Sequence, residues 1–312
     1  MRGAFIQTLV EVAARDPRVL LLTGDLGYMA VEPFAEAYPD RFFNAGVAEQ
    51  NMVGLATGLA EAGFLPFVYS IVNFAVLRPY EFIRNGPVLH RLPVRIVGVG
   101  GGLEYSHNGA SHFGLEDVAV MRVQPGLTVL APADAAQTST ALRATWDLPG
   151  PVYYRLGKDD RLRVPGLDGQ FALGRAQCIR PGDDLLFVTM GSVAAEAVAA
   201  ADLLAEQDVA AGVLVVASVS PPPVEDLLAA LRDVPLVVTV EAHYATGGVG
   251  SLVAEVLAEH AVPCRLLRLG VQRSPNGLTG SQDYLYREHG LAREALVAAA
   301  LAQLARLPLP VR

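Results

Sequence analysis

Charged side chains are scarce in this sequence, and lysine is almost absent. Charged residues make up 18% of the 312 residues, and hydrophobic residues make up 52%. This composition is too apolar for a disordered chain, and it predicts large buried surfaces, including a surface between subunits. Lys158 is the only lysine, and it stands between a glycine and two aspartates, where its amine stays solvated. Schiff-base and pyridoxal phosphate enzymes need an activated lysine amine, so the sequence argues against both classes.

Other features that would indicate a function class are also missing. Cys178 and Cys264 lack metal-ligand spacing, so we expect a reducing compartment, the cytoplasm. No GxxxxGK[ST] loop occurs, which excludes a P-loop nucleotide enzyme. The net charge is −8 without a basic cluster, which argues against a nucleic-acid partner. The longest uncharged runs, residues 62–77 and 209–224, contain proline, and no basic segment followed by an apolar one opens the chain. We therefore expect neither a membrane span nor a signal peptide.

Short apolar runs alternate with helical patterns along the whole chain. In the first half these runs are residues 19–23, 65–70, 94–99, 127–131 and 152–155. In the second half they are residues 185–189, 210–216, 236–240 and 264–269. Strands that alternate with helices predict parallel sheets with helices on both faces. The sequence therefore predicts an α/β protein with two doubly wound domains.

A charged segment that contains glycine and proline divides the two halves. We expect the first domain at residues 1–158, a linker at 159–171 and the second domain at 172–312. Within the first domain, Pro79 lies inside the helical pattern of residues 73–84. Because proline cannot donate a backbone hydrogen bond, we expect a kink or a new helix start there.

Glu49 stands where an extended segment, residues 42–45, turns into a helix rich in small residues. Gly54 and Gly58 lie four residues apart in this helix, which would let another backbone approach closely. One interpretation places Glu49 at a tightly packed subunit contact, directed at a cofactor. The alternative is a carboxylate in the first helical turn that only suits the helix dipole.

Polar residues follow the predicted strands, at the sheet edge where open α/β sheets bind ligands. Asp25 follows the first strand and is either a ligand-binding residue or a turn aspartate. The glycine-rich segment 100–112 follows the third strand and predicts a loop at the same edge. In the second half, residues 241–250 form the strongest candidate for a ligand or interface loop. We expect the glycines of this loop to serve close helix packing rather than phosphate binding.

Five segments together resemble the transketolase family, and more narrowly the C-terminal subunit of split transketolases. They are GVAEQNMVGLATGLAEAG (46–63), SHFGLEDVAVMR (111–122), LTVLAPAD (127–134), GPVYYR (150–155) and VEAHYATGGVGS (240–251). They occur in the order of the family and cover nearly the whole chain.

The resemblance implies a thiamine diphosphate enzyme made of three domain types. This chain would supply a pyrimidine-binding domain with a mainly parallel sheet, followed by the transketolase C-terminal domain. The diphosphate-binding domain of the family carries a GDG…N motif for Mg²⁺ and phosphates, and GDG does not occur in this sequence. The resemblance therefore implies an N-terminal partner subunit that holds the Mg²⁺ and shares the cofactor. It also implies an α₂β₂ assembly, self-association through the pyrimidine-binding domain, and small-molecule substrates.

The resemblance assigns cofactor chemistry to a few residues. Thiamine catalysis needs a carbanion at thiazolium C2, and a carboxyl group hydrogen-bonded to ring N1′ promotes the tautomer that removes the C2 proton. Glu49 stands at the family's position for this carboxyl group. Phe74 matches an aromatic residue that packs on the aminopyrimidine, with a helix-core residue as the alternative. His112, in the sequence GASH, matches a histidine that assists proton transfer on the substrate-derived intermediate. We include Asp25 as a cofactor contact.

The substrate-binding pattern of the family is only partly kept. Arg155 matches the arginine that binds a sugar phosphate, and a salt bridge at the domain boundary is its alternative. Asn108 replaces an acidic residue that binds sugar hydroxyls, and residues 100–103 lack the family's other histidine. We take Arg155, Asn108 and His107 as candidate substrate-binding residues and expect ketol or acyl transfer on a non-standard substrate. His107 and His112 are five apart, a poor metal pair, so we expect no metal on this chain.

Three alternatives share this fold. A β subunit of a 2-oxo acid dehydrogenase would need a lipoyl-carrier partner, and it fits EQNMVG and EDVAVMR less well. A deoxyxylulose-phosphate synthase normally keeps all three domains in one chain. A non-catalytic assembly subunit is the third alternative, and the joint presence of Glu49, Phe74 and His112 argues against it.

Overall fold

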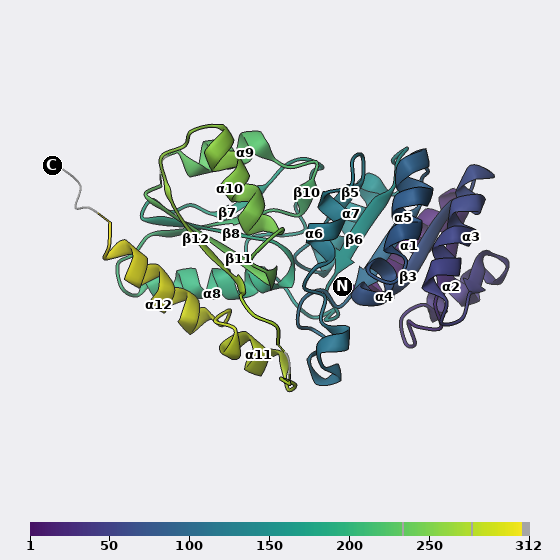
Figure 1. The fold of residues 1–312 in the computed structure, drawn as a ribbon, viewed down its shortest axis with the longest axis horizontal. Coiled ribbons are helices and arrows are strands. Elements are labelled where there is room, and N and C mark those ends of the chain that lie inside the picture. Colours follow the sequence, from purple (N-terminus) through teal and green to yellow (C-terminus); the bar gives the residue numbers. More distant parts are fainter. Residues whose placement is uncertain (233, 276, 308–312) are drawn as a thin grey trace.

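The computed structural model describes residues 1–232, 234–275 and 277–307, which form two α/β domains side by side (Figure 1). The first domain, drawn from purple to teal, contains a seven-stranded sheet, and the second, drawn in green and yellow, a five-stranded sheet. Asp233, Asn276 and residues 308–312 belong to the expected second domain and lie outside the described residues.

The first sheet has the strand order β10-β5-β6-β4-β3-β1-β2. Six of its strands come from the first half of the chain and run parallel to one another. They are β1 (Val19–Thr23), β2 (Phe42–Asn44), β3 (Leu65–Ile71), β4 (Arg95–Val99), β5 (Thr128–Leu130) and β6 (Val152–Leu156). The strands β1, β3, β4 and β6 are buried along their whole length, as a sheet covered on both faces requires.

Helices cover both faces of the first sheet. One face packs against α1 (Arg2–Arg15), α2 (Glu32–Ala37) and α7 (Ala135–Thr145). The other face packs against α3 (Glu49–Glu61), α4 (Val72–Val76), α5 (Tyr80–Ile83) and α6 (Asp117–Arg122). The helical pattern that the sequence predicts at residues 73–84 is divided between α4 and α5 at Pro79, which confirms the expected break. A π-helical turn, Arg84–Val88, continues α5.

The second sheet has the strand order β12-β11-β8-β9-β7. Its strands are β7 (Gln177–Arg180), β8 (Leu185–Thr189), β9 (Ala211–Val215), β11 (Leu236–Tyr244) and β12 (Arg265–Val271). Its helices are α8 (Ala194–Ala205), α9 (Val224–Leu231), α10 (Val249–Glu259), α11 (Gln282–Glu288) and α12 (Arg293–Leu304). All strands are parallel except the edge strand β7. The structure therefore confirms two α/β domains with mainly parallel sheets.

One strand joins the two domains. Residues Ser218–Ser220, which follow β9, form β10 and add antiparallel to β5, with Ser218 opposite Leu130. The backbone N–H of Ala131 also donates to the carbonyl of Ala217, at 2.8 Å. The first sheet therefore ends in a strand that comes from the second half of the chain.

Some elements differ from the sequence-based expectation. The strand β11 continues through Glu241 and His243, which the sequence assigned to a loop. The apolar pattern in the sequence stops at these polar residues, which is why a loop was predicted. In the structure both side chains are buried and hydrogen-bonded, so the strand continues through them. The strands β7 and β10 and the helix α11 were not predicted. β7 is only partly buried and β10 has three residues, so neither produces a continuous apolar run.

Candidate functional site

Glu49 is the first residue of α3, and it lies beside the carboxyl ends of β1 and β2. The strand β2 ends at Asn44, and Gly46, with a φ of 70°, turns the chain toward the helix. The Glu49 side chain is 2% exposed. Gly24, in the turn after β1, lies against it, because an added Cβ would be 3.4 Å from Glu49 Cγ. A carboxylate suits the first turn of a helix, but when buried it also needs a partner.

Arg78 is that partner. It follows α4 and precedes Pro79, and its Nη1 donates to Glu49 Oε2 at 3.0 Å and to Oε1 at 3.2 Å. Its guanidinium carbon also lies 4.0 Å from the centre of the Phe74 ring, a cation–π contact. The Arg78 side chain is 46% exposed, so the ion pair is buried on one side only. The sequence analysis missed Arg78. Its spacing of four residues from Phe74, which places two side chains on one helical face, could have found it.

His112 completes a row of four side chains. Its ring meets the Phe74 ring edge to face, with the ring centres 5.2 Å apart, and its Nδ1 lies 3.0 Å from Ser111 Oγ. Burial, and then the positive charge of Arg78, lowers the pKa of His112. The imidazole is therefore neutral near pH 7 and able to accept a proton. The structure thus brings together Glu49, Phe74 and His112, with Arg78 between the first two.

Asn73 ties the loop of His112 to α4. Its Nδ2 donates to the carbonyls of Phe113, at 2.9 Å, and Ser111, at 3.2 Å. Its Oδ1 is buried and has no hydrogen-bond partner among the described residues. A buried acceptor without a partner is costly, so this oxygen is a candidate contact for a bound molecule.

His107 and Asn108 lie in a 3₁₀ turn, Ser106–Asn108, and both are exposed. His107 lines a cavity of about 460 Å³. The other residues that line it are Arg2, Glu104, Ser106, Lys158, Asp159, Asp160, Arg161 and Gln282. Burial raises the pKa of Glu104, a residue that accepts hydrogen bonds from the Lys158 backbone and the Ser192 hydroxyl. The cavity wall carries three basic side chains and three acidic ones, so it is not a purely basic site, and Asn108 lies in the adjacent turn.

Arg155 does not face that cavity, in contrast to its expected place in a phosphate site. Its side chain is 4% exposed, and its Nε donates to Asp117 Oδ2 at 2.8 Å. Its Nη2 donates to the carbonyls of Gly114, at 3.0 Å, and Ala242, at 2.9 Å. The guanidinium is thus engaged in a buried ion pair within the first domain and in one hydrogen bond to the second domain, at the domain boundary. This arrangement favours the salt bridge that the sequence analysis left as the alternative.

Asp25 likewise has the contacts of a turn residue. It is exposed, and its φ is 59°, in the left-handed region. Its backbone N–H donates to Asn44 Oδ1 at 3.0 Å, and its own Oδ1 accepts from Asn44 Nδ2 at 2.9 Å. These reciprocal bonds join the ends of β1 and β2 beside Glu49. The geometry favours the turn aspartate over a cofactor ligand.

The segment 241–250 contains a buried acid and a buried histidine. Glu241 Oε2 accepts from the backbone N–H of Val249, and its Oε1 accepts from that of Gly250, at 2.9 and 3.0 Å. Burial raises the pKa of Glu241 to about 7 and lowers that of His243 to about 4. A Cβ at Gly248 would lie 1.8 Å from Glu241 Oε2, so close helix packing explains this glycine, as the sequence analysis expected. The segment therefore packs α10 against β11, and it does not form an exposed loop that could bind a ligand.

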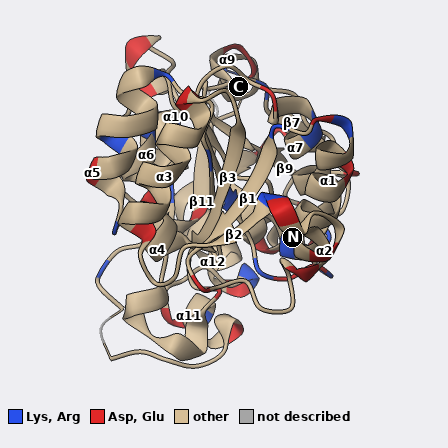
Figure 2. Cartoon of the chain, turned by 90° about the vertical axis from the view of Figure 1, so that its right-hand side faces the viewer, with Lys and Arg blue, Asp and Glu red and all other residues tan. Residues whose placement is uncertain are grey.

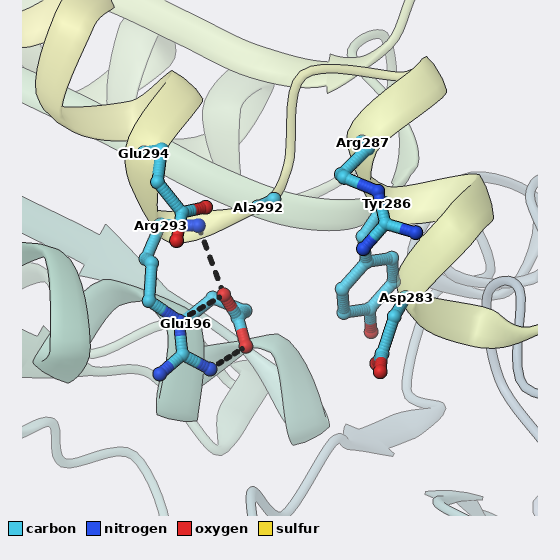
Figure 3. A pocket seen from close by; sticks show the side chains of 7 residues that line it. All are labelled: Glu196, Asp283, Tyr286, Arg287, Ala292, Arg293 and Glu294. Carbon is cyan, nitrogen blue, oxygen red and sulfur yellow. Dashed lines mark hydrogen bonds and ion pairs between the residues drawn. The ribbon is translucent and has the colours of Figure 1, made fainter.

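A second cavity, of about 220 Å³, lies where α8, α11 and α12 meet, and all its lining residues belong to the second domain (Figure 3). Arg293 and Glu196 form an ion pair of 2.7 Å in its wall. Within the described residues, no group of three or more histidine, cysteine or acidic side chains could hold a metal ion. None of the described helices is long and apolar enough to cross a membrane.

Comparison with known families gives two matches that together cover most of the chain. The pyrimidine-binding domain of transketolase matches residues 1–161, and the transketolase C-terminal domain matches residues 174–296. Both matches describe domains of the same multidomain enzyme, in the same order.

Individual relatives agree with these matches. The chain is 37% identical over 301 residues to the 6-deoxy-6-sulfo-D-fructose transketolase subunit SqwH of Clostridium sp. (strain MSTE9), covering 96% of this chain and 93% of the relative. It is 34% identical over 305 residues to one subunit of the apulose-4-phosphate transketolase of Phocaeicola vulgatus, covering 96% of each. A solved structure described as a split gene transketolase, inactive beta4 tetramer, matches with a TM-score of 0.87 and 38% identity, covering 97% of each chain.

Proposed function

This chain belongs to the transketolase family, as the C-terminal subunit of a split, transketolase-like transferase, and from that premise we propose that it binds thiamine diphosphate together with a separate N-terminal subunit. The reaction we propose is the transfer of a two-carbon ketol (or acyl) unit to an aldehyde-type acceptor. The observation that carries the proposal is the row of Glu49, Arg78, Phe74 and His112. The matched families and the two relatives described above are transketolases, so they do not favour a 2-oxo acid dehydrogenase subunit.

The residues of this row fit the aminopyrimidine end of thiamine diphosphate. Glu49 provides a buried carboxyl group, and Phe74 provides a partly buried aromatic ring. An aromatic ring with hydrogen-bonding nitrogens needs both a flat apolar surface and a charged or polar partner. Asn73 Oδ1 is a further acceptor at the start of the same helix.

Each residue then has a defined chemical task. When bound, thiamine diphosphate would supply an acidic thiazolium carbon whose deprotonated form is a nucleophile for carbonyl groups. Glu49 would place its carboxyl group against pyrimidine N1′ and hydrogen-bond to it, as its buried position at the start of α3 allows. His112, neutral near pH 7, would accept or return a proton on the substrate through Nε2, because Nδ1 lies next to Ser111 Oγ. Phe74 would exclude water from one side of the pyrimidine.

The substrate is expected to end in an anionic group. Three basic side chains, Lys158, Arg2 and Arg161, could bind such a group in the cavity beside His107, although three acidic side chains line the same cavity. The two relatives above are named for a sulfonated and a phosphorylated sugar, which supports this class of substrate. Asn108, in the adjacent turn, could bind a sugar hydroxyl. A substrate screen that found ordinary pentose and hexose phosphates to be the most efficient substrates would contradict a non-standard substrate.

The surface of α3 supports assembly through the first domain. Glu49 and Glu61, at its two ends, are the only charged residues of α3, and Figure 2 shows the helix mostly in tan. Gly58 is exposed, and an added Cβ would meet no atom within 4 Å in this chain. Leu55 and Phe82 are 45% and 41% exposed. We propose that this surface packs against a second pyrimidine-binding domain in an α₂β₂ enzyme, with the Mg²⁺ and the GDG…N motif on the partner. The two free thiols, Cys178 and Cys264, fit a cytoplasmic enzyme.

The decisive experiment uses this chain co-purified with its N-terminal partner. Calorimetry with thiamine diphosphate and Mg²⁺ should show binding by the complex and none by this chain alone. Glu49→Gln should abolish turnover while light scattering shows an unchanged assembly. Glu36→Gln, an exposed carboxylate on α2 of the same domain, is the matched control and should keep full turnover. Unchanged turnover in Glu49→Gln would support the non-catalytic assembly subunit instead.

A further inference from the structure

The loop that carries His112 is closed at its base. Gly102 and Gly114 exchange two backbone hydrogen bonds, of 2.8 and 2.9 Å, so residues 103–113 leave and rejoin the sheet edge at one point. We call Gly101, Gly102 and Gly114 the loop base. His112 lies two residues before Gly114, so any movement of the loop base also moves the imidazole.

The guanidinium of Arg155 touches the loop base on both sides. Its Nη2 donates to the carbonyl of Gly114, at 3.0 Å. On the other side, a Cβ added at Gly101 would lie 2.8 Å from Arg155 Cζ, so the backbone of Gly101 rests against the guanidinium. One side chain therefore contacts both the entry and the exit of the loop.

Arg155 is itself fixed by two further contacts. Asp117 Oδ2 accepts from its Nε at 2.8 Å, and the carbonyl of Ala242, in β11 of the second domain, accepts from its Nη2 at 2.9 Å. Tyr153 also donates to Asp117 Oδ2, at 2.7 Å. The planar fork of an arginine can reach these acceptors at once, whereas the single ammonium of a lysine cannot reproduce this geometry.

The loop base is also packed against the helix that carries Phe74. A Cβ at Gly114 would lie 2.6 Å from Cγ1 of Val72, in the first turn of α4. A Cβ at Gly102 would lie 2.5 Å from the carbonyl oxygen of Ala242. The loop base therefore fills a space between Arg155, α4 and β11, with no room for a side chain. This packing sets where His112 stands relative to Phe74.

We propose that Arg155 is a positioning residue that fixes the base of the loop 103–113 and thereby holds His112 against Phe74, without touching the substrate. The inference rests on the proposed function, in which His112 acts on the substrate. It replaces the phosphate-binding role that the sequence suggested for Arg155. Because small misplacements of a catalytic group can cost about 10²-fold in rate, the effect should fall on kcat.

The test compares Arg155→Lys with a matched control in the assembled enzyme. Arg155→Lys should lower kcat by about 10²-fold while KM changes by less than about threefold, since only the geometry of His112 is altered. Arg122→Lys is the control, because Arg122, like Arg155, is a first-domain arginine that pairs with a carboxylate and contacts the second domain, through Glu255, but it does not contact the loop base. The control should keep wild-type kinetics. A phosphate-binding Arg155 would instead give a raised KM with kcat unchanged, and that result would overturn the proposal.

A second measurement is independent of activity and uses this chain alone. Amide hydrogen exchange of residues 103–113 should be at least tenfold faster in Arg155→Lys than in the wild type, while the strands of the first sheet stay protected. The proposal is wrong if the exchange of this loop is unchanged. The two claims can fail separately. If the wild-type complex shows no turnover but loop exchange is still faster in Arg155→Lys, the proposed function is refuted and the anchoring role of Arg155 stands.

A double variant covers the case in which Arg155→Lys does not fold. Asp117→Asn with Arg155→Met leaves no unpaired buried charge and keeps an acceptor for the Tyr153 hydroxyl. It should fold, as judged by circular dichroism, and still show the fast exchange of residues 103–113. Protection equal to that of the wild type in this variant would also contradict the proposal.

Discussion

Replacing Glu241 by glutamine should change how the stability of this protein depends on pH. Glu241 lies in β11 and is fully buried against the first turn of α10, and its burial outweighs the two backbone N–H donors and the charges of Arg155 and Arg268. Its pKa is therefore raised from 4.5 to about 7. His243, with its Nδ1 3.8 Å from Glu241 Oε2, is shifted in the opposite sense by burial, and its pKa falls from 6.5 to about 4.

The two shifts have opposite effects on stability. Between about pH 4.5 and 7 the native state holds a proton on Glu241 that the unfolded state has lost, so the free energy of unfolding falls as the pH rises. A shift of this size corresponds to about 3 kcal/mol over that range. Between about pH 4 and 6.5 the unfolded state binds a proton on His243 that the native state does not. The free energy of unfolding therefore rises with pH by a similar amount, and the two contributions nearly cancel in the wild type.

Glu241→Gln removes only the first contribution. A glutamine cannot accept both backbone hydrogen bonds, so we expect a constant loss of about 1–3 kcal/mol. Added to this loss, the free energy of unfolding should rise by about 3 kcal/mol from pH 4 to 6.5, because the titration of His243 is no longer balanced. Urea unfolding followed by circular dichroism, at pH 4.5, 5.5, 6.5 and 7.5 and at one chain concentration, measures both parts.

The matched control is Glu255→Gln, which changes a half-exposed carboxylate on α10, the helix that packs against Glu241. It should keep the wild-type profile within about 0.5 kcal/mol at every pH. A Glu241→Gln profile that runs parallel to the wild type would mean that Glu241 titrates as an ordinary carboxyl group, and the reasoning from its burial would be refuted.

Three further changes test other parts of the structure. Arg78→Met removes the charge that helps to lower the pKa of His112, so this pKa should move up toward 6.5, and an NMR titration that shows no change would disagree. Gly248→Ala places a Cβ 1.8 Å from Glu241 Oε2 and should cost about 1–3 kcal/mol or more in thermal or urea unfolding; a neutral result would mean that this packing relaxes freely. Gly58→Ala should stabilise the isolated chain by about 0.5–1 kcal/mol, because this exposed helical glycine has open space around it, and a clear loss of stability would contradict that.

The central strands were predictable because a parallel sheet with two covered faces produces uninterrupted apolar runs. The run at residues 19–23 coincides with β1, and Pro79 marks the break between α4 and α5. The strand β10 could not be read in this way, because it has only three residues and its partner, β5, belongs to the other half of the chain. The hydrophobic pattern along the sequence indicates which helices and strands are buried. It does not indicate which distant segments pair with each other.

The same limit applies to the candidate site. Glu49 could be selected from its place at the start of a helix and from the family pattern. The spacing of Arg78 from Phe74 could have placed these two side chains together, but nothing in the sequence indicated that Arg78 would pair with Glu49, 29 residues away. Arg155 has the right residue type for a phosphate site, but its acceptors are Asp117, Gly114 and Ala242, which only the folded chain assembles. Residue type alone could not separate a ligand-binding arginine from a structural one.

The strand β10 also bears on how such a chain can be divided or recombined. The linker between the family's two domains looks like a natural place to cut the gene. A cut there would remove β10 and leave β5 with unpaired backbone groups along its edge, beside an apolar core that continues from the first domain into the second. The two separated halves would expose an unpaired strand edge and apolar surface, which could associate with each other or with unrelated chains. An engineered exchange between relatives should therefore carry residues 217–221 along with the first domain.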